Sequence, residues 1–312
     1  MRQSTILQSV SCSGIGVHSG APVSLTLRPT AENYGIYFQR TDIKNTPINE
    51  TLIPAKWDCV EKGDFCTKIT NQFGHSVSTI EHLMAALAAQ NITNVLIEID
   101  GPELPIMDGS AAPFLFLIDC AGIKVQEAQK RCIRIIKEVT VKTEYGFASL
   151  LPSETFEADV EITFPGREGM TSQKFKSKNL HECFKKDLAR ARTFGFYADV
   201  EKLKQAGLAR GGSLENAVVF EQGTVLNPEG LRFDDECIRH KVLDMVGDLY
   251  LAGASIKGRF HGQNFGHALN NALLRALLAD RKAWVEEVYQ APANDLSSYS
   301  YAPLKGARSA IA

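Results

Sequence analysis

Residues 239–248 of this 312-residue sequence read Arg239-His240-Lys241-Val242-Leu243-Asp244-Met245-Val246-Gly247-Asp248. Leu243, Val246 and Leu249 recur at the spacing of one face of an α-helix, which indicates an amphipathic helix packed against a core. The pattern extends over residues 238–252, and Gly253 follows at a position where helices commonly end. We therefore expect a helix over residues 238–252.

Polar residues four positions apart on this helix offer a metal site. Side chains at positions i and i+4 lie on the same helical face, so His240 and Asp244 can bind one ion together, and Asp248 lies one further turn along. An exposed His/Asp pair on an ordinary amphipathic helix has the same spacing, which is common by chance. The stretch alone leaves both interpretations open.

A second polar group stands at the start of an apolar stripe, in Ser78-Thr79-Ile80-Glu81-His82. The stripe predicts a helix over residues 78–89. A serine followed three residues later by a glutamate is also a capping box, in which Glu81 would only cap the start of its own helix. A role for Glu81 and His82 in chemistry is the alternative, and the local pattern does not decide between them.

His267 stands at the start of a third expected helix, over residues 266–280. The positive end of a helix disfavours an imidazolium there. To act as a general acid near neutral pH, His267 needs a carboxylate partner that raises its pKa, and Asp248 is a candidate. A structural role is the alternative.

The other histidines, His18, His75, His181 and His261, have no comparable context and are interpreted as structural or surface residues.

Strands and helices occur in both halves of the chain. Alternating apolar residues predict strands at 23–27 and 94–99 in the first half, and at 133–136, 139–141 and 158–164 in the second. Between the halves the composition turns polar over residues 125–131, which favours a domain boundary there. We expect one α/β domain over residues 1–126, a second over residues 127–290, and a tail at 291–312.

Composition excludes several classes of protein. The net charge of −2 gives no general attraction to nucleic acid or to anionic lipid. No apolar run approaches the length of a membrane span, and the N-terminus has no apolar signal-peptide region. The seven cysteines include no C-x-x-C pair, so we expect reduced thiols in a cytoplasmic protein. Any metal site is then expected to use mainly His and carboxylate ligands.

Taken together, several blocks of the sequence resemble the zinc-dependent UDP-3-O-acyl-N-acetylglucosamine deacetylases of lipid A biosynthesis. They run in family order from Gly14 to about Leu278. The blocks are Ser78–Leu83, Pro105–Phe114, Ala189–Gly195, Gly211–Ser213, Leu231–Phe233, Arg239–Asp244, Gly247–Tyr250 and Gly266–Asn271.

The resemblance implies an α+β fold. It consists of two α/β sandwich domains packed through their helical layers, each with a small inserted element, and the active site lies between them. In the second domain, an insert around residues 193–215 is expected to form an apolar passage for a fatty acyl chain. Phe194, Phe196, Leu203 and Leu208 are apolar enough for that passage, and ordinary core is their alternative role.

The resemblance also implies roles for the metal site. His82, His240 and Asp244 match the ligands of a catalytic zinc ion, a set that leaves one position for water. Imidazole and carboxylate ligands suit Fe²⁺ as well. Glu81 matches the general base, which takes a proton from the water that attacks the acetamide.

Further residues match the acid and the substrate contacts. Thr193 would stabilise the oxyanion together with zinc, and His267, oriented and charged by Asp248, would protonate the leaving amine. Lys241 is expected to meet the diphosphate. Phe164 is expected to stack on the uracil, and Phe194 to contact the substrate.

The implied activity is hydrolysis of the acetamide of UDP-3-O-(3-hydroxyacyl)-N-acetylglucosamine, with release of acetate. The partner is this small-molecule substrate, and we expect a monomer. Two alternatives remain: a zinc hydrolase of another N-acetylated sugar nucleotide, and a non-catalytic protein that binds an acyl-sugar nucleotide. The presence of base and acid candidates beside the ligand candidates argues against a pure binder.

Overall fold

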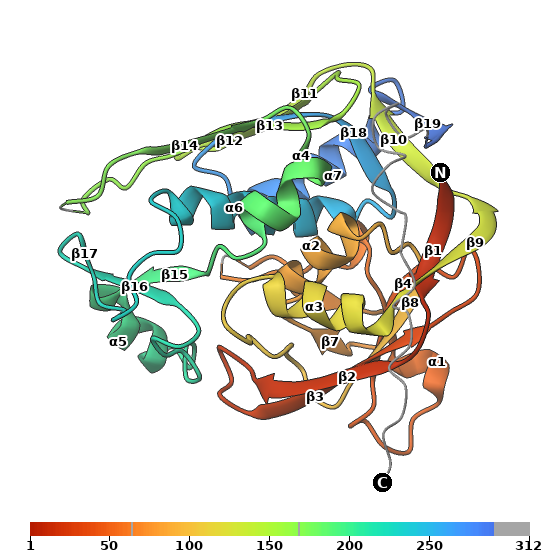
Figure 1. The fold of residues 1–312 in the computed structure, drawn as a ribbon, viewed down its shortest axis with the longest axis horizontal. Helices are drawn as coiled ribbons and strands as arrows, with labels where there is room; N and C mark the ends of the chain where they lie inside the picture. The colour runs from red at the N-terminus through yellow and green to blue at the C-terminus, as the bar shows by residue number, and fades with distance from the viewer. Residues whose placement is uncertain (64, 168, 290–312) are drawn as a thin grey trace, which may run out of the picture.

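Two larger sheets enclose a layer of helices in the computed structural model, which describes residues 1–63, 65–167 and 169–289 (Figure 1). The predicted tail at 291–312 lies outside the described residues. The fold is mixed α+β, as the sequence predicted. None of the helices in the described residues has the length and apolar character needed to span a bilayer.

The first half of the chain builds a five-stranded sheet in the order β2-β3-β8-β4-β5. β4 and β8 are parallel and the other pairs are antiparallel. Alternate residues Val23, Leu25 and Leu27 of β3 are buried, which is why this segment forms a strand with one face on the core. The elements are β1 (Arg2–Ile6), β2 (Val10–Ile15), β3 (Pro22–Pro29), β4 (Ile36–Arg40), α1 (Ile48–Thr51), β5 (Leu52–Pro54), a 3₁₀ turn (Trp57–Cys59), β6 (Ile69–Thr70), β7 (Ser76–Val77), α2 (Glu81–Ala89), β8 (Val95–Ile99), α3 (Ala112–Ala121) and β9 (Ile123–Gln129).

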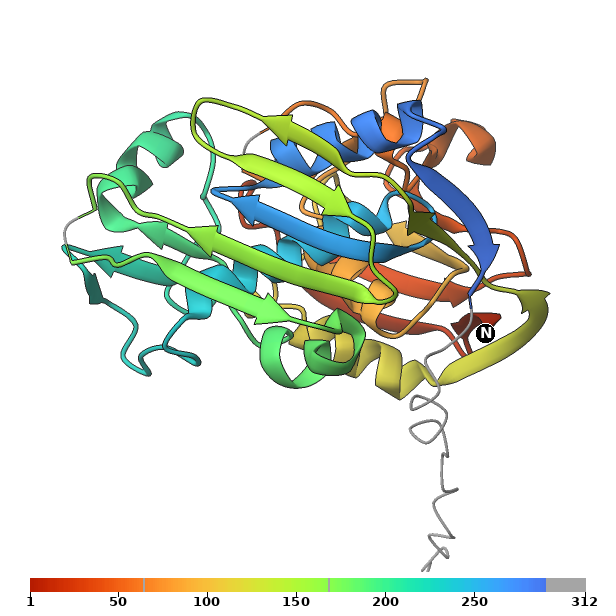
Figure 2. The same ribbon diagram turned by 90° about the horizontal axis from the view of Figure 1, so that it is seen from above.

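The second half builds a seven-stranded sheet around β18 (Figure 2). β18 pairs with β12 in antiparallel and with β10 and β13 in parallel register. The elements are β10 (Arg131–Ile135), β11 (Val139–Lys142), β12 (Phe147–Leu151), β13 (Phe156–Ile162), β14 (Gln173–Ser177), α4 (Leu180–Cys183), a π-helical turn (Phe184–Leu188), β15 (Phe194–Phe196), α5 (Tyr197–Gln205), β16 (Val218–Glu221), β17 (Thr224–Val225), α6 (Glu236–Tyr250), β18 (Ser255–Gln263), α7 (His267–Ala279) and β19 (Trp284–Val288).

The three expected helices are confirmed with small shifts at their ends, as α2, α6 and α7. The polar segment at 125–131 belongs mostly to β9, which pairs with the N-terminal β1. β10 follows at once and joins the second sheet, so the chain passes from one part of the fold to the other at Lys130. β15 and α5 lie within the insert expected around residues 193–215, and β15 joins β16 and β17, which follow that range, in a separate small sheet that projects from the body (Figure 1).

Helices α2 and α6 pack against each other in the layer between the sheets, and a glycine permits their close approach. A Cβ atom placed on Gly247 of α6 would lie 2.1 Å from the carbonyl oxygen of Glu81 and 3.1 Å from the amide nitrogen of Ala85. Both atoms belong to the backbone of α2 and cannot rotate away. Any side chain at position 247 would therefore push the two helices apart.

We expect the Gly247→Ala substitution to lower the free energy of unfolding by about 1–3 kcal/mol, because the added methyl group overpacks the contact between the helices. Denaturation in urea measures the effect. Gly195→Ala is the control, since its added Cβ would meet no atom within 4 Å. Equal stability of the two variants would contradict the packing argument.

Candidate active site

Three buried side chains from α2 and α6 form a cluster suited to a metal ion. His82 lies in the first turn of α2, and His240 and Asp244 lie one turn apart on α6. One ligand atom from each lies within 4.8 Å of the others. Asp244 Oδ1 is 3.3 Å from His240 Nε2 and 3.6 Å from His82 Nε2. The structure thus brings together the three residues that the sequence offered as ligands.

Protonation and hydrogen bonding within the cluster fit a bound cation. The His240 Nδ1 nitrogen lies 3.0 Å from the carbonyl oxygen of Ala191, a contact in which Nδ1 carries the proton and Nε2 is left free to bind a metal. Burial lowers the pKa of His240 to about 3, against the opposing effect of Asp244, so its ring is neutral.

Asp244 supplies the negative charge of the cluster. Burial raises the pKa of its carboxyl, but His240 and Lys241 outweigh burial and hold that pKa well below its usual range. The buried Oδ1 atom has no hydrogen-bond partner among the described residues. A buried carboxylate oxygen without a partner is costly, and a cation there removes that cost. Two imidazole nitrogens and one carboxylate oxygen are the donor set of a catalytic zinc site.

Glu81 is the first residue of α2 and does not form the capping box that its spacing allowed. Ile80 is the N-cap of α2, without a side-chain cap, so Ser78 does not cap the helix. The Glu81 carboxylate instead accepts a hydrogen bond of 3.0 Å from the backbone N–H of Thr67. Burial raises the pKa of Glu81, although the nearby His267 and His82 act in the opposite direction. A raised carboxyl pKa suits a group that must take up a proton near neutral pH.

His267 opens α7 and meets the carboxylate partner that the sequence suggested. Its Nδ1 nitrogen lies 2.9 Å from Asp248 Oδ2, which also accepts a 2.8 Å hydrogen bond from Asn270. Its Nε2 nitrogen lies 3.9 Å from Asp244 Oδ2, at the edge of the metal cluster. Burial lowers the pKa of His267, but Asp248, Glu81 and Asp244 more than compensate and raise it to about 9.

Lys241 is half-buried beside the same group of charges. Its ammonium donates a 2.9 Å hydrogen bond to Asp244 Oδ2 and lies 5.9 Å from the centre of the Phe194 ring. Burial lowers the pKa of Lys241, but Asp244 outweighs it and raises that pKa above its usual value. Lys241 therefore carries a positive charge directly beside the candidate ligand. The contact of Lys241 with the diphosphate stays a prediction.

Thr193 follows closely after Ala191, whose carbonyl contacts His240. Its backbone N–H donates a 2.8 Å hydrogen bond to the carbonyl of Gly109. Gly109 has a φ of +82°, and a Cβ atom there would lie 2.1 Å from the carbonyl oxygen of Asn216. The turn at Gly109 therefore requires glycine, and it fixes the segment that carries Thr193. The role of the Thr193 hydroxyl stays a prediction.

Phe194 and Phe164 lie in one group of half-buried rings next to the cluster. The Phe194 ring is 6.4 Å from that of His240 and 6.3 Å from that of Phe164. Phe196 on β15 and Phe220 on β16 extend the group, with ring centres 6.0 Å apart. An apolar path of aromatic rings thus leads from His240 into the small sheet of β15, β16 and β17. Sequence analysis did not single out Phe220.

Two further residues near the cluster were not predicted from the sequence. Thr67 is buried between Glu81, Asp248 and His267, yet it stands alone in its segment without a recognisable pattern. Arg192 is fully buried and forms an ion pair with Glu236 at the start of α6, at 2.9 Å. This pair ties the segment of Ala191 and Thr193 to the helix that carries two of the ligands.

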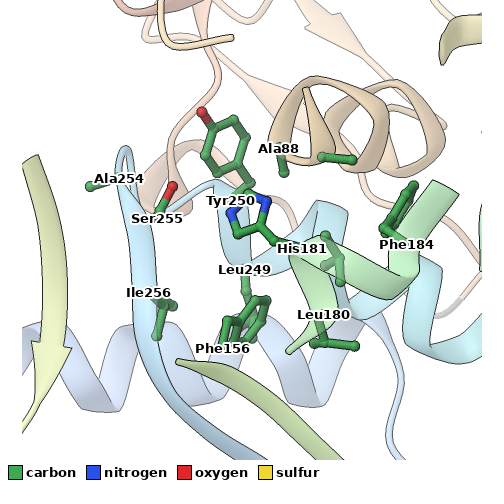
Figure 3. A pocket seen from close by; sticks show the side chains of 12 residues that line it. Ala88, Phe156, Leu180, His181, Phe184, Leu249, Tyr250, Ala254, Ser255 and Ile256 are labelled. Carbon is green, nitrogen blue, oxygen red and sulfur yellow. The ribbon is translucent and has the colours of Figure 1, made fainter. Parts of the chain in front are cut away.

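A separate cavity of about 30 Å³ lies at the other end of α6, between α2, α4 and β18 (Figure 3). Its wall is mostly apolar and includes Leu249, Phe156 and the ring of His181. Burial there lowers the pKa of His181 to about 3, with a further contribution from Lys130. His181 is therefore neutral in an apolar wall, which agrees with its interpretation as a structural residue.

Comparison with known proteins places the chain in a family. A family model described as UDP-3-O-acyl N-acetylglycosamine deacetylase matches residues 3–279. A UDP-3-O-acyl-N-acetylglucosamine deacetylase of Shewanella frigidimarina is 48% identical over 283 residues, which cover 90% of this chain and 91% of that protein. Proteins of the same name are 46% identical in Vibrio cholerae serotype O1, over 91% of this chain and 92% of that protein, and in Shewanella halifaxensis, over 96% of each. The chain belongs to the UDP-3-O-acyl-N-acetylglucosamine deacetylase family.

Proposed function

We propose that this chain hydrolyses the acetamide of UDP-3-O-(3-hydroxyacyl)-N-acetylglucosamine and releases acetate, as a metal-dependent amidohydrolase of lipid A biosynthesis. The main support is the convergence of Glu81 and His82 on α2 with His240 and Asp244 on α6 and with His267 on α7. Such a convergence provides metal ligands, a base and an acid within one buried site. Family membership supplies the substrate.

The domain arrangement that accompanies this function is also a proposal. Residues 1–126 would form one α/β sandwich domain, and residues 127–290 a second that packs on it through the helical layers. The contact of α2 with α6 and the change of sheet at Lys130 support this division. The insert around residues 193–215 would receive the acyl chain, since the aromatic rings of Phe194, Phe196 and Phe220 line up from the cluster.

His82, His240 and Asp244 are proposed to hold the metal ion. When bound there, Zn²⁺ lowers the pKa of water and polarises the acetamide carbonyl. The residues themselves are prepared for a cation, because both buried imidazoles lie near Asp244 Oδ1, the oxygen left without a partner. Fe²⁺ accepts the same donors.

Glu81 is proposed to take the proton from the attacking water. Its carboxylate is buried beside the ligand His82, and the Thr67 amide fixes one of its oxygens. Its raised pKa brings it closer to neutral pH, where a base gives the best balance between ionisation and proton affinity.

His267 is proposed to give a proton to the leaving amine, which is a very poor leaving group without one. Asp248 keeps the imidazole protonated and aims Nε2 at the cluster by binding Nδ1. Thr193 is proposed to stabilise the oxyanion through a hydrogen bond from its hydroxyl. Lys241 is proposed to approach the diphosphate, Phe164 the uracil, and Phe194 the neighbouring part of the substrate.

Metal-stripped protein should release no acetate from this substrate, and about one zinc per chain should restore release, because the site needs a Lewis acid. A coupled enzymatic assay for acetate measures the release in both conditions. UDP-N-acetylglucosamine without the acyl chain is the comparison substrate. Equal turnover of both substrates would favour a hydrolase of other sugar nucleotides, and no release with zinc bound would favour a non-catalytic binder.

The ligand assignment predicts that His240→Ala loses most of its zinc, since one of three ligands is removed. Metal content after dialysis measures the loss. His261→Ala is the matched control, because His261 is exposed on β18, where its ring contacts Phe147 and the carbonyl of Asp159, outside the metal cluster. Unchanged zinc in the His240 variant would remove that residue from the metal site.

Glu81→Gln should keep its zinc but lower kcat by roughly 10²–10⁴-fold, because the amide keeps the shape of the side chain and cannot take a proton. Steady-state kinetics and metal analysis on the same sample separate the two effects. Glu61→Gln serves as control, since Glu61 lies in the exposed pair with Lys68. Full turnover in the Glu81 variant would contradict its role as base.

The alkaline limb of the profile of kcat/KM against pH should reflect the deprotonation of His267. The protonated imidazole is the active form, and its pKa is raised to about 9, so kcat/KM should fall as the pH rises through that value. Asp248→Asn removes the charge that raises this pKa and leaves burial to lower it, so the limb should move to lower pH. Asp280→Asn, at the exposed end of α7, should leave the limb in place. An unmoved limb in the Asp248 variant would rule out their coupling.

A further inference from the structure

We propose that Thr67 is a positioning residue for this reaction, which holds the carboxylates of Asp248 and Glu81 in place and thereby aligns the acid with the base. The inference rests on the proposed roles of Glu81 and His267. Thr67 lies in the segment before β6, outside the helices that carry the other residues of the site, and it is only 3% exposed.

The side chain of Thr67 fixes Asp248. Its hydroxyl donates to Asp248 Oδ1 at 2.5 Å and lies 3.2 Å from His267 Nδ1. The other oxygen, Asp248 Oδ2, is held by His267 and Asn270. With both oxygens engaged, the plane of the carboxylate is set, and so is the direction in which the His267 ring points.

The backbone of Thr67 fixes Glu81. The amide N–H donates to Glu81 Oε2 at 3.0 Å, and the carbonyl of the same residue accepts from Ile80, the N-cap of α2, at 3.4 Å. One residue therefore binds the base through its peptide group and the partner of the acid through its side chain. The contacts of its backbone are with the start of α2, and the contacts of its hydroxyl are with Asp248 on α6 and His267 on α7. Thr67 therefore connects the start of α2 to the α6–α7 pair.

Loss of the hydroxyl alone should disturb this alignment. In Thr67→Val the shape of the side chain and the backbone N–H remain, but Asp248 Oδ1 loses its donor in a buried place where water does not easily replace it. The carboxylate is then free to turn, and His267 loses its fixed direction. Small displacements of catalytic groups have large effects on rate, because the geometry of proton transfer is narrow.

The experiment compares Thr67→Val, Thr67→Ser and Thr51→Val in the zinc-loaded protein. Thr67→Val should lower kcat by roughly ten- to hundredfold, the range for a lost hydrogen bond to a charged group, with little change in KM or zinc content. Thr67→Ser keeps the hydroxyl and should stay within about threefold of the wild type. Thr51 is also buried, and its hydroxyl bonds only within α1, so Thr51→Val should keep its kcat.

A double-mutant cycle with Asp248→Ala separates positioning from general loss of structure. If Thr67 acts through Asp248, the Val substitution should have almost no further effect on kcat in the Asp248→Ala background. An equal effect in both backgrounds, or wild-type kcat in Thr67→Val, overturns the inference. Thr67→Ala gives the same comparison if the Val variant does not fold. Wild-type kcat in Asp248→Ala would instead contradict the proposed role of Asp248 as partner of the acid His267, which distinguishes that failure from the failure of Thr67.

Discussion

The backbone contact between α2 and α6 at Gly247 is the constraint on which the site depends. Gly247 meets the carbonyl of Glu81, the residue at which α2 begins, and Asp244 and Asp248 lie on either side of this glycine on α6. The close approach therefore sets the first turn of α2 directly against the acidic face of α6. A packing contact without any chemistry of its own thus decides whether His82 can share an ion with Asp244.

Burial of many charges in one place is the second constraint, and it separates the roles of similar groups. Asp244 and Glu81 are both buried carboxyls, yet the neighbours of Asp244, His240 and Lys241 among them, hold its pKa low, while burial raises the pKa of Glu81. The pKa values of two histidines are separated in the same way, so that His240 is neutral and His267 is protonated near neutral pH. Such separated pKa values suit Asp244 and His240 to the role of ligands, Glu81 to that of a base and His267 to that of an acid.

The sequence predicted those features that a single helix determines and missed those that need several segments. The spacing of His240 and Asp244 is a property of one helix, and their shared face is confirmed. The pattern from Ser78 to Glu81 was ambiguous, because a capping box and a base look alike until the partner of Glu81, the Thr67 amide, is known. Thr67 itself could not be found, since its contacts with Asp248 on α6 and His267 on α7 join residues that are 181 and 200 positions away in the sequence.

The two carboxylate oxygens of Asp244 have different partners, and this difference connects the electrostatics of the site to its proposed chemistry. Oδ2 accepts a hydrogen bond from Lys241, whereas Oδ1, which lies near both imidazoles, has no hydrogen-bond partner among the described residues and is the oxygen that best suits a cation. A carboxylate held in this way offers one oxygen, and a site with three single donors keeps a position for water, as catalytic rather than structural zinc sites do. The Lys241 ammonium would therefore influence how Asp244 binds a metal ion, in addition to the substrate contact proposed for it.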